Sequence, residues 1–249
     1  MGFSGKAYIV TGAASGMGKA TVQKLLGEGA IVHAIDLSSE IPDHGETTGM
    51  QWSYPIVDIS SRDEVKKTYD LIFERSPQVS GLVNSAGIFF GTPNSPEGDK
   101  LLRKLFDVNV MGTWNTNTEF YQHVKDSRSA GTNEPPVSIV NLGSMASVRG
   151  IVGMSGYVAS KHAVLGLSRT FTQDWGKEGF RVNTVAPGAV RTPMAIDLTK
   201  EGPPGNSPYS GALKSISEPE ELANAICFLL GDESSAISGL VCEVNGGWP

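Results

Sequence analysis

The sequence predicts an α/β fold: a doubly wound, mainly parallel seven-stranded sheet with helices on both faces. Short apolar runs, typical of buried strands, alternate along the chain with longer segments whose apolar residues recur at helical spacing. A glycine-rich turn, Gly12 to Gly18, lies between the first run and the first helical pattern. Alternating strands and helices form parallel sheets that are covered on both faces. Because 249 residues fit one domain of this class, we expect a single domain over residues 1–249.

The strands are predicted from the apolar runs. The third run contains Pro55, and because proline cannot donate a hydrogen bond to a neighbouring strand, this strand is expected at an edge of the sheet. The predicted strands cover residues 7–10, 31–35, 51–57, 81–84, 137–141, 181–186 and 241–244.

The helices are predicted between the strands. The first should end at Gly29, since glycine commonly terminates helices. The last should begin with the capping box of residues 217–220, which has a proline in its first turn. The stripe of Ala163, Leu167, Phe171 and Trp175 is interpreted as packing surface. The predicted helices are the segment before Gly29, residues 61–75, residues 96–125, the segment that opens at Ser155, and residues 218–230.

Composition limits the classes of function. The formal net charge of −6 and the absence of any basic run argue against nucleic-acid binding. Cys227 and Cys242 have no metal-ligand spacing and are expected to be reduced thiols, and the scattered histidines do not predict a metal site. No apolar run is long enough for a membrane span, and no signal peptide is recognised, so a cytoplasmic location is expected.

The turn Thr11-Gly12-Ala-Ala-Ser-Gly16-Met-Gly18 indicates a phosphate site. Without Cβ atoms the turn can be tight, and a pyrophosphate can approach both the backbone and the N-terminus of the following helix. The spacing Gly-x-x-x-Gly-x-Gly is weak as a bare pattern, and a plain tight turn is the alternative. Its position between a strand and a helix favours dinucleotide binding.

Asp36 ends the second predicted strand, about 20 residues after the glycines. A carboxylate there can accept hydrogen bonds from the ribose hydroxyls of an adenosine and would repel a 2′-phosphate. Position 37 is Leu37, and the residue just before Gly16 is neither Arg nor Lys, so neither position offers a cation to bind that phosphate. The sequence therefore predicts NAD rather than NADP, with a solvated strand-end aspartate as the alternative.

Tyr157 and Lys161 lie four residues apart in a predicted helix, so their side chains share one face. The ammonium favours the phenolate and should lower the pKa of the tyrosine toward working pH, which suits a general acid/base. A buried ring beside a lysine that reaches solvent is the common alternative for this pair taken alone.

Taken together, these motifs resemble the series found in short-chain dehydrogenases/reductases of the single-domain NAD type, over essentially the whole chain. The motifs that carry the resemblance are Thr11-Gly12-x-x-x-Gly16-x-Gly18, Asn84-Ser-Ala-Gly87, Asn109, Ser144, Tyr157-x-x-x-Lys161 and Pro187-Gly188. Three departures are visible: Gly143 precedes Ser144 where serine is usual, Ser85 replaces a second asparagine, and Asn245 stands where aspartate is usual. None of them removes a reacting group.

The resemblance implies a Rossmann-type fold and a set of site residues. Tyr157 would be the general acid/base, Lys161 would assist it and bind the nicotinamide ribose, Ser144 would hold the substrate oxygen, and Asn109 would support a water. The substrate contacts would be Ser144, Met145, Tyr157 and Met194. The implied cofactor contacts are Gly12, Ser15, Gly16, Met17, Gly18, Asp36, Leu37, Asp58, Ile59, Asn84, Ala86, Gly87, Tyr157, Lys161, Pro187, Gly188, Val190 and Thr192.

The function that follows is an NAD(H)-dependent oxidoreductase, an alcohol dehydrogenase or ketone reductase that moves hydride between nicotinamide and a secondary alcohol or ketone. Two alternatives stay open: a repurposed biosynthetic enzyme such as an epimerase or cyclase, and a non-catalytic NAD-binding module. The loop of residues 191–215 is long for a compact domain and is predicted to cover the substrate. Its apolar content predicts an apolar small-molecule substrate. The resemblance also implies a homotetramer.

Overall fold

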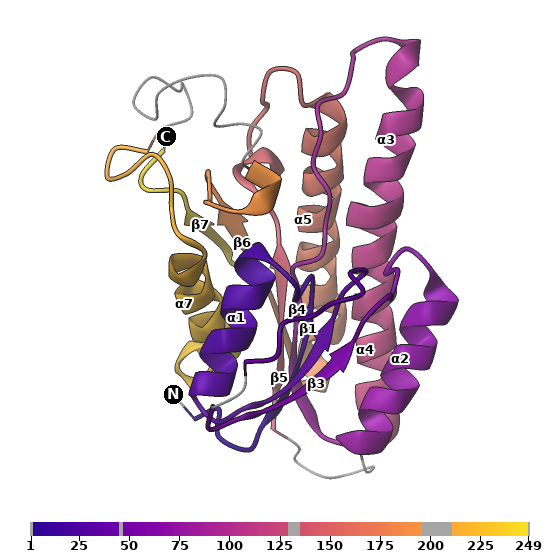
Figure 1. Ribbon diagram of the computed structural model, residues 1–249, viewed down its shortest axis with the longest axis vertical. Helices are drawn as coiled ribbons and strands as arrows, with labels where there is room; N and C mark the ends of the chain where they lie inside the picture. The colour runs from indigo at the N-terminus through magenta and orange to yellow at the C-terminus, as the bar shows by residue number, and fades with distance from the viewer. Residues whose placement is uncertain (1, 45–46, 129–134, 196–210, 249) are drawn as a thin grey trace.

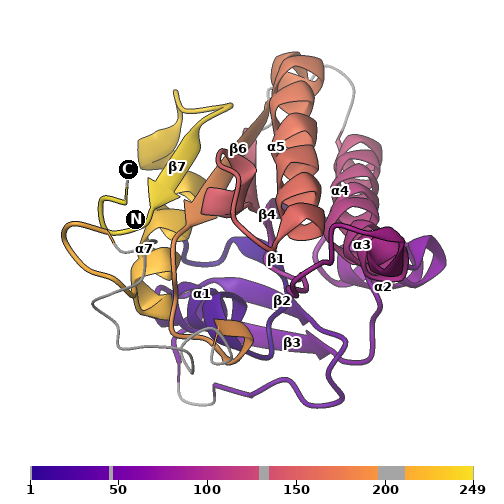
Figure 2. The ribbon, with the colours of Figure 1, turned by 90° about the horizontal axis from the view of Figure 1, so that it is seen from above.

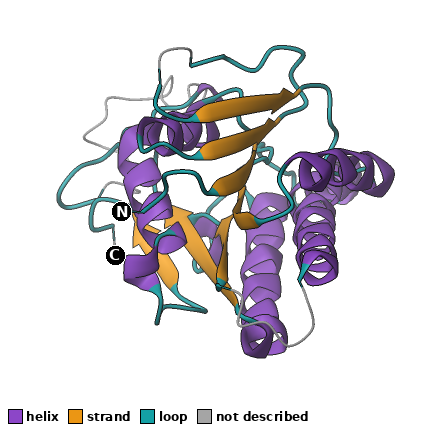
Figure 3. Ribbon diagram, turned by 90° about the horizontal axis from the view of Figure 1, so that it is seen from below, coloured by secondary structure: helices purple, strands orange, loops and turns teal. Residues whose placement is uncertain are grey.

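The computed structural model describes residues 2–44, 47–128, 135–195 and 211–248. Seven strands form one sheet, and every strand pair is parallel (Figure 3). The strands are β1 (Ala7–Thr11), β2 (Ile31–Ile35), β3 (Met50–Tyr54), β4 (Val79–Asn84), β5 (Val137–Leu142), β6 (Phe180–Pro187) and β7 (Val241–Val244). The predicted seven-stranded, doubly wound α/β class is confirmed.

The strand order is β3-β2-β1-β4-β5-β6-β7. From β1 the chain builds outward through β2 to β3, and then returns to place β4 on the other side of β1. The direction of winding therefore changes between β1 and β4. Ligands of open α/β sheets bind at such a switch, outside the carboxyl ends of the strands. Here the glycine turn follows β1, and Asn84 ends β4.

Helices cover both faces of the sheet (Figures 1 and 2). In Figure 2, α1 and α7 lie together on one side, and α2, α4 and α5 lie on the other. Two apolar clusters match these layers: one joins α1 and α7 to the sheet, and the other joins α2, α4 and α5 to it. The helices are α1 (Gly16–Gly27), α2 (Arg62–Arg75), α3 (Asp99–Leu105), α4 (Thr113–Ser127), α5 (Ser155–Trp175) and α7 (Pro219–Leu230).

Strand pleating explains how one sheet serves two cores. Val10 belongs to the cluster under α1 and α7, whereas its neighbour Ile9 belongs to the cluster under α2, α4 and α5, and both are fully buried. Successive side chains of a strand point to opposite faces. A strand buried on both faces therefore reads as a continuous apolar run, which is the pattern that predicted these strands.

Residues 96–125, predicted as one helix, are more complex. A 3₁₀ turn (Pro96–Gly98) leads into α3, a π-helical segment (Phe106–Gly112) follows, and α4 continues from it in one rod (Figure 1). The π segment contains Asn109. The sequence did not indicate this change, because residue types do not specify which carbonyl each backbone N–H reaches, and that choice distinguishes a π segment from an α-helix.

The element ends largely follow the predictions. The third strand lies at the sheet edge as predicted, but it ends at Tyr54 and not at residue 57, so Pro55 follows the strand instead of interrupting it. Gly29 has φ +83° at the end of the first helix. The capping box of the last helix begins one residue later than predicted: Glu218 is the N-cap, and its N–H donates to Glu221 Oε2 at 2.8 Å. Ser217 instead bonds backbone to backbone with Ala189 and Arg191.

Three further predictions concern the substrate loop, membrane spans and the cysteines. Of the predicted substrate loop, residues 196–210 lie outside the described ranges. None of the helices within those ranges combines the length and hydropathy that crossing a bilayer requires. Cys227 is buried, Cys242 is half-buried, and both are free thiols.

Candidate active site

The glycine turn after β1 packs directly on the turn after β4. Gly12 has φ +67°, and a Cβ placed on it would lie 2.7 Å from the backbone nitrogen of Ala86. A Cβ on Gly18 would lie 2.0 Å from the carbonyl oxygen of Gly12. Thr11 Oγ1 accepts a hydrogen bond from Ala86 N at 3.2 Å. Only glycine allows this approach of helix, turn and second strand.

The first turn of α1 presents backbone N–H groups at the same place. Ser15 is the N-cap, and its side chain makes no capping hydrogen bond within the described part of the chain. Gly16 has φ +51° and approaches Thr192, whose Cγ2 would lie 3.0 Å from an added Cβ. Met17 is half-buried against the apolar cluster under α1. An open helix N-terminus of this kind binds phosphate groups well.

Asp36 is held in a fixed orientation at the end of β2. Its Oδ2 accepts a hydrogen bond from Ala14 N at 2.8 Å, and its Oδ1 accepts one from Ser38 N at 2.8 Å. The neighbouring Leu37 is 63% exposed. A cleft of about 780 Å³ opens at this carboxylate. It is lined by Ala14, Ser15, Asp36, Ser38, Ser39, Glu40, Ile41, Pro42, Ser53 and Pro55.

Asp58 and Ile59 lie after β3, before α2. The Asp58 carboxylate accepts hydrogen bonds from the backbone and the hydroxyl of Ser60, at 2.8 and 2.7 Å. Ile59 is buried and packs against Gly112 of the π segment, where an added Cβ would lie 2.6 Å from Ile59 Cδ1. This contact ties the turn that holds Asp58 to the segment that holds Asn109.

Asn84, at the end of β4, donates from Nδ2 to Asn141 Oδ1 at 2.8 Å. Its own Oδ1 is buried and has no hydrogen-bond partner among the described residues. An unpaired buried oxygen costs free energy unless a donor reaches it. Gly87 follows in the same turn, and a Cβ on it would lie 3.1 Å from Asn109 Oδ1 and 3.8 Å from Lys161 Nζ.

Asn109 links three elements. Its Oδ1 accepts from Ile88 N at 2.8 Å, and its Nδ2 donates to Ile88 O at 3.0 Å and to Ser160 Oγ at 3.1 Å. The buried amide therefore joins the π segment to the strand-end turn after β4 and to α5. π segments inside α-helices often occur at functional sites.

Ser144, Tyr157 and Lys161 come together at the carboxyl end of β5. The Ser144 side chain hydrogen-bonds with the Tyr157 side chain. Lys161 is buried; its Nζ donates to Leu142 O at 2.8 Å and lies 5.8 Å from the centroid of the Tyr157 ring. Phe89 packs edge-on against that ring, with centroids 4.8 Å apart and planes at 87°. Tyr157 itself is half-buried.

The pKa values correct one expectation. Burial raises the pKa of Tyr157, and only the hydrogen bond with Ser144 opposes it. Burial also lowers the pKa of Lys161 to about 8. The predicted lowering of the tyrosine pKa by Lys161 is therefore not produced by the protein atoms alone. The reason is geometric: the ammonium is bonded to the Leu142 carbonyl rather than to the phenol oxygen.

The remaining predicted contacts lie along β6 and beyond it. Pro187 ends β6, and Gly188 N donates to Val244 O at 3.0 Å. Val190 is buried, and Thr192 Oγ1 lies 3.5 Å from its carbonyl oxygen. The two predicted substrate methionines differ: Met194 is 46% exposed, whereas Met145 is only 1% exposed.

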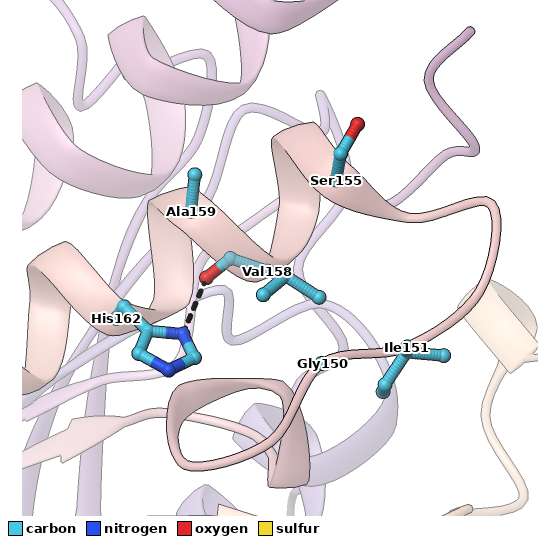
Figure 4. A pocket seen from close by; sticks show the side chains of 6 residues that line it. All are labelled: Gly150, Ile151, Ser155, Val158, Ala159 and His162. Carbon is cyan, nitrogen blue, oxygen red and sulfur yellow. Dashed lines mark hydrogen bonds between the residues drawn. The ribbon is translucent and has the colours of Figure 1, made fainter. Parts of the chain in front are cut away.

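A second cavity, of about 420 Å³, lies beside α5 (Figure 4). It involves a helix stripe that faces away from Tyr157 and Lys161, because residues 155, 158, 159 and 162 follow the i, i+3, i+4, i+7 pattern. Its lining residues are Gly150, Ile151, Ser155, Val158, Ala159 and His162. The cavity is therefore separate from the side of the helix that carries Tyr157 and Lys161.

Two supporting residues were not recognised from the sequence. Ser160 bonds Asn109 from α5, and Asn141 is a buried amide that bonds Asn84, Asn117 and Ser168. A polar residue inside an otherwise apolar buried strand is the signal that could have identified Asn141, because buried amides require partners. Among the described residues, no group of three or more His, Cys, Asp or Glu side chains is placed to hold a metal ion.

Comparison with curated proteins gives relatives that match along nearly their whole length. The chain is 36% identical to 2,5-dichloro-2,5-cyclohexadiene-1,4-diol dehydrogenase of Sphingobium indicum, over 98% of this chain and 97% of that protein. It is 30% identical to levodione reductase of Leifsonia aquatica, over 98% of this chain and 94% of that protein.

Solved structures agree in fold. A short-chain dehydrogenase of Mycobacterium paratuberculosis bound to NAD has a TM-score of 0.83 and 27% identity, with 99% of this chain and 98% of that chain covered. Carveol dehydrogenase of Mycobacterium avium in complex with NAD has a TM-score of 0.84 and 26% identity, with 99% of each chain covered. The family model described as enoyl-(acyl carrier protein) reductase matches residues 12–249. With the motif series placed at one end of the sheet, these matches show that the chain belongs to the short-chain dehydrogenase/reductase family of oxidoreductases.

Proposed function

We propose that this protein is an NAD(H)-dependent oxidoreductase that interconverts a secondary alcohol and a ketone. The observation that carries the proposal is the convergence of Ser144, Tyr157 and Lys161 beside the turn of Gly87, which connects them to the glycine turn after β1. A pure nucleotide-binding module would have no use for the serine and tyrosine. Two structural neighbours were solved with NAD bound, which supports the choice of cofactor.

The residues present fit a dinucleotide. Gly12 and Gly18 let the turn pack backbone against backbone, with no side chain over it, and the open N-terminus of α1 can receive the pyrophosphate. Asp36 borders a cleft large enough for the adenosine and presents a carboxylate to the ribose hydroxyls. Asn84 Oδ1, at the end of the neighbouring strand β4, is a buried acceptor without a partner among the described residues. When bound, NAD supplies or removes the hydride.

The protein's own groups handle the proton. In oxidation, the substrate hydroxyl proton passes to the Tyr157 oxygen as the carbon loses hydride; in reduction, Tyr157 returns a proton to the developing alkoxide. The Ser144 hydroxyl is placed next to the Tyr157 side chain, so a substrate oxygen that reaches the tyrosine can take over the single O–H donor of the serine. Lys161, buried with a pKa of about 8 and with Nζ 5.8 Å from the centroid of the Tyr157 ring, can stabilise the phenolate by its charge when protonated.

The substrate is proposed to be a small apolar alcohol or ketone. Phe89 provides an aromatic wall next to Tyr157, and Met194 offers an exposed apolar side chain at the start of the predicted substrate loop. The cyclohexadienediol named for the Sphingobium relative makes ring alcohols and ring ketones the first compounds to test.

The assembly is proposed to be a homotetramer in the cytoplasm. Large apolar side chains are exposed near the π segment and α4, with Met111 48% and Trp114 38% exposed, and these could be covered by a second copy. Light scattering after gel filtration measures the mass directly. A monomeric mass at micromolar concentration would contradict the proposal.

The test is a screen of secondary alcohols with NAD and ketones with NADH, followed by absorbance at 340 nm, and the variant Tyr157→Phe. This variant keeps the ring and its packing on Phe89 but removes the proton carrier. We expect kcat to fall by about 100- to 10,000-fold while NADH binding is retained. Tyr121→Phe, which removes a hydroxyl bonded to Glu178 at the surface, is the matched control.

Full activity of Tyr157→Phe would overturn the mechanism. NADH binding without turnover of any screened compound would favour the binding module. Product formation without net change in absorbance would favour an epimerase or cyclase, in which the cofactor is regenerated within each turnover.

A further inference from the structure

Asn245, in the turn after β7, directs its side-chain amide at three acceptors. Its Nδ2 lies 3.0 Å from Met145 Sδ, 3.0 Å from Trp248 O and 3.3 Å from Glu243 Oε2. Its Oδ1 accepts from Gly247 N at 2.9 Å and Trp248 N at 3.2 Å. Oδ1 thus bonds only within the C-terminal turn, whereas Nδ2 bonds within it and also donates out of it, to Met145.

The outward contact falls on the residue next to Ser144. Met145 is 1% exposed and opens the short 3₁₀ turn in which Ser144 N donates to Ser147 Oγ at 3.1 Å and Ala146 N donates to Ser144 Oγ at 3.1 Å. A shift of the Met145 side chain would move this turn. Since Ser144 bonds Tyr157, the position of the methionine sulfur bears on the position of the serine hydroxyl.

Arg149, at the other end of this turn, strengthens the connection. Its Nη1 lies 3.2 Å from Glu243 Oε2 and 3.9 Å from Met145 Sδ, and its guanidinium lies 5.5 Å from the centroid of the Trp248 ring. The Ser144 turn and the C-terminal segment therefore contact each other at both ends of residues 145–149.

The backbone of Asn245 contacts two further segments. A Cβ on Gly188 would lie 2.9 Å from Asn245 Cα, so the Pro187-Gly188 turn packs on this residue. A Cβ on Gly211 would lie 2.4 Å from Asn245 O, and Leu213 N donates to Gly246 O at 2.7 Å. Asn245 thus lies where the Ser144 turn, the Gly188 turn and the segment at residues 211–213 meet.

We propose that Asn245 is a positioning residue of the active site: its amide N–H groups fix Met145 and thereby the Ser144 hydroxyl, while its backbone supports the segment that returns from the substrate loop. The inference rests on the proposed function. Sulfur, carbonyl and carboxylate are all acceptors, so this position requires a donor. The aspartate that is usual in the family lacks that donor and would place a second carboxylate beside Glu243.

Asn245→Asp and Asn245→Ala separate the two ends of the side chain. Aspartate keeps the acceptor for Gly247 N and Trp248 N but loses the donor to Met145, Trp248 O and Glu243, whereas alanine loses both ends. For Asn245→Asp we expect faster amide hydrogen exchange in residues 143–149 and a kcat about tenfold lower at saturating NADH, because small displacements of a positioned group reduce rate strongly. Asn224→Asp, the same change at an exposed position on α7, is the matched control.

A pH series adds a signature that a general loss of packing would not give. When protonated, the carboxyl group that Asn245→Asp introduces carries an O–H donor. Glu243 should raise its pKa and the Arg149 guanidinium should lower it, so protonation belongs to the acid end of the pH series. The kcat of Asn245→Asp relative to the natural protein should therefore recover as the pH falls from about 8 to about 5, and that of Asn245→Ala should not. If Asn245→Asp fails to fold, Met145→Leu removes the sulfur acceptor at similar volume and should give the same increase in exchange over residues 143–149.

Exchange and kcat of Asn245→Asp equal to those of the natural protein would overturn the proposal, as would impairment of Asn245→Ala alone. Hydrogen exchange does not depend on turnover. If the natural protein reduces no ketone, the proposed function fails, while the exchange comparison still decides whether Asn245 positions the Ser144 turn.

Discussion

At the scale of single residues, the proposed preference for NAD over NADP depends on the carboxylate of Asp36. Both of its oxygens already accept backbone N–H groups, from Ala14 and Ser38, so the group is oriented before any ligand arrives. A fixed acceptor binds ribose hydroxyls at little entropic cost and repels a 2′-phosphate.

Asp36→Ala should therefore reduce the ratio of kcat/KM with NAD to kcat/KM with NADP by about tenfold or more, since a charge-assisted hydrogen bond is lost and a repulsion is removed. Steady-state kinetics with both cofactors measures the ratio. Ser39→Ala, in the same cleft but uncharged, serves as control. A natural protein that prefers NADP would contradict the assignment.

Also at the scale of single residues, the pKa of Tyr157 could not be predicted from the Tyr157-x-x-x-Lys161 motif. The spacing of Tyr157 and Lys161 placed both on one face of α5, as expected, but the lysine bonds Leu142 O, a backbone atom of β5. No sequence pattern specifies which carbonyl a buried ammonium will reach. The sequence therefore predicted that Tyr157 and Lys161 lie close together. It could not predict their pKa values, which depend on burial and on the contact of Lys161 with Leu142 O.

At the scale of elements, the β1–α1 turn makes the sharpest stability prediction. Gly18→Ala places a Cβ 2.0 Å from Gly12 O, and because the obstacle is backbone, the turn must open. We expect the free energy of unfolding to fall by roughly 1–3 kcal/mol and NADH affinity to fall with it.

Gly27→Ala is the matched control for this change, since the same helix has open space at that position. Alanine there should be neutral or stabilising by up to about 1 kcal/mol. Urea unfolding and NADH fluorescence titration measure both quantities. Equal stability of the two variants would show that the turn tolerates a side chain and would remove its role in bringing helix and strand together.

Helices and strands were predictable where the local sequence pattern determines the structure. They were not predictable where contacts with distant parts of the chain determine it. β2 is a buried parallel strand and was placed to the residue from its apolar run. β7 was also placed to the residue, although it is a half-buried edge strand with Glu243 exposed. The π segment was missed; it packs through Gly112 on Ile59, a contact with another part of the chain that no local pattern indicates. The capping box shifted by one residue because Ser217 is occupied in a backbone bridge to Val190.

At the scale of the whole molecule, the parallel sheet explains how distant motifs form one site. β1, β4, β5 and β6 are consecutive in the sheet, and all end at the same edge. The motifs at Gly12, Asn84, Ser144 and Pro187 follow or end these four strands, so correct strand order alone brings them together. The role of the C-terminal turn could not be predicted, because it depends on the packing of side chains from β7 and the Ser144 turn.

Global stability should respond to pH through His33, which lies in β2 and is completely buried. Its Nδ1 lies 3.1 Å from Tyr54 Oη in β3, and its Nε2 lies 2.9 Å from Ser76 Oγ after α2, so the ring joins the edge strand to the helix beside it. Burial, assisted by the nearby Arg75, lowers the pKa of His33 from 6.5 to about 4. The folded protein therefore holds the ring neutral.

The unfolded chain binds a proton at His33 below pH 6.5, and the folded chain does so only near pH 4. The contribution of His33 to stability is thus fully present above pH 6.5 and is lost as the pH falls toward 4, by about 3 kcal/mol in total. Urea unfolding of the natural protein between pH 7.5 and about 4.5 should show this decline. His33→Gln, which cannot titrate, should show a shallower one caused by other groups; identical slopes would mean that the edge of the sheet opens and hydrates the ring before the protein unfolds.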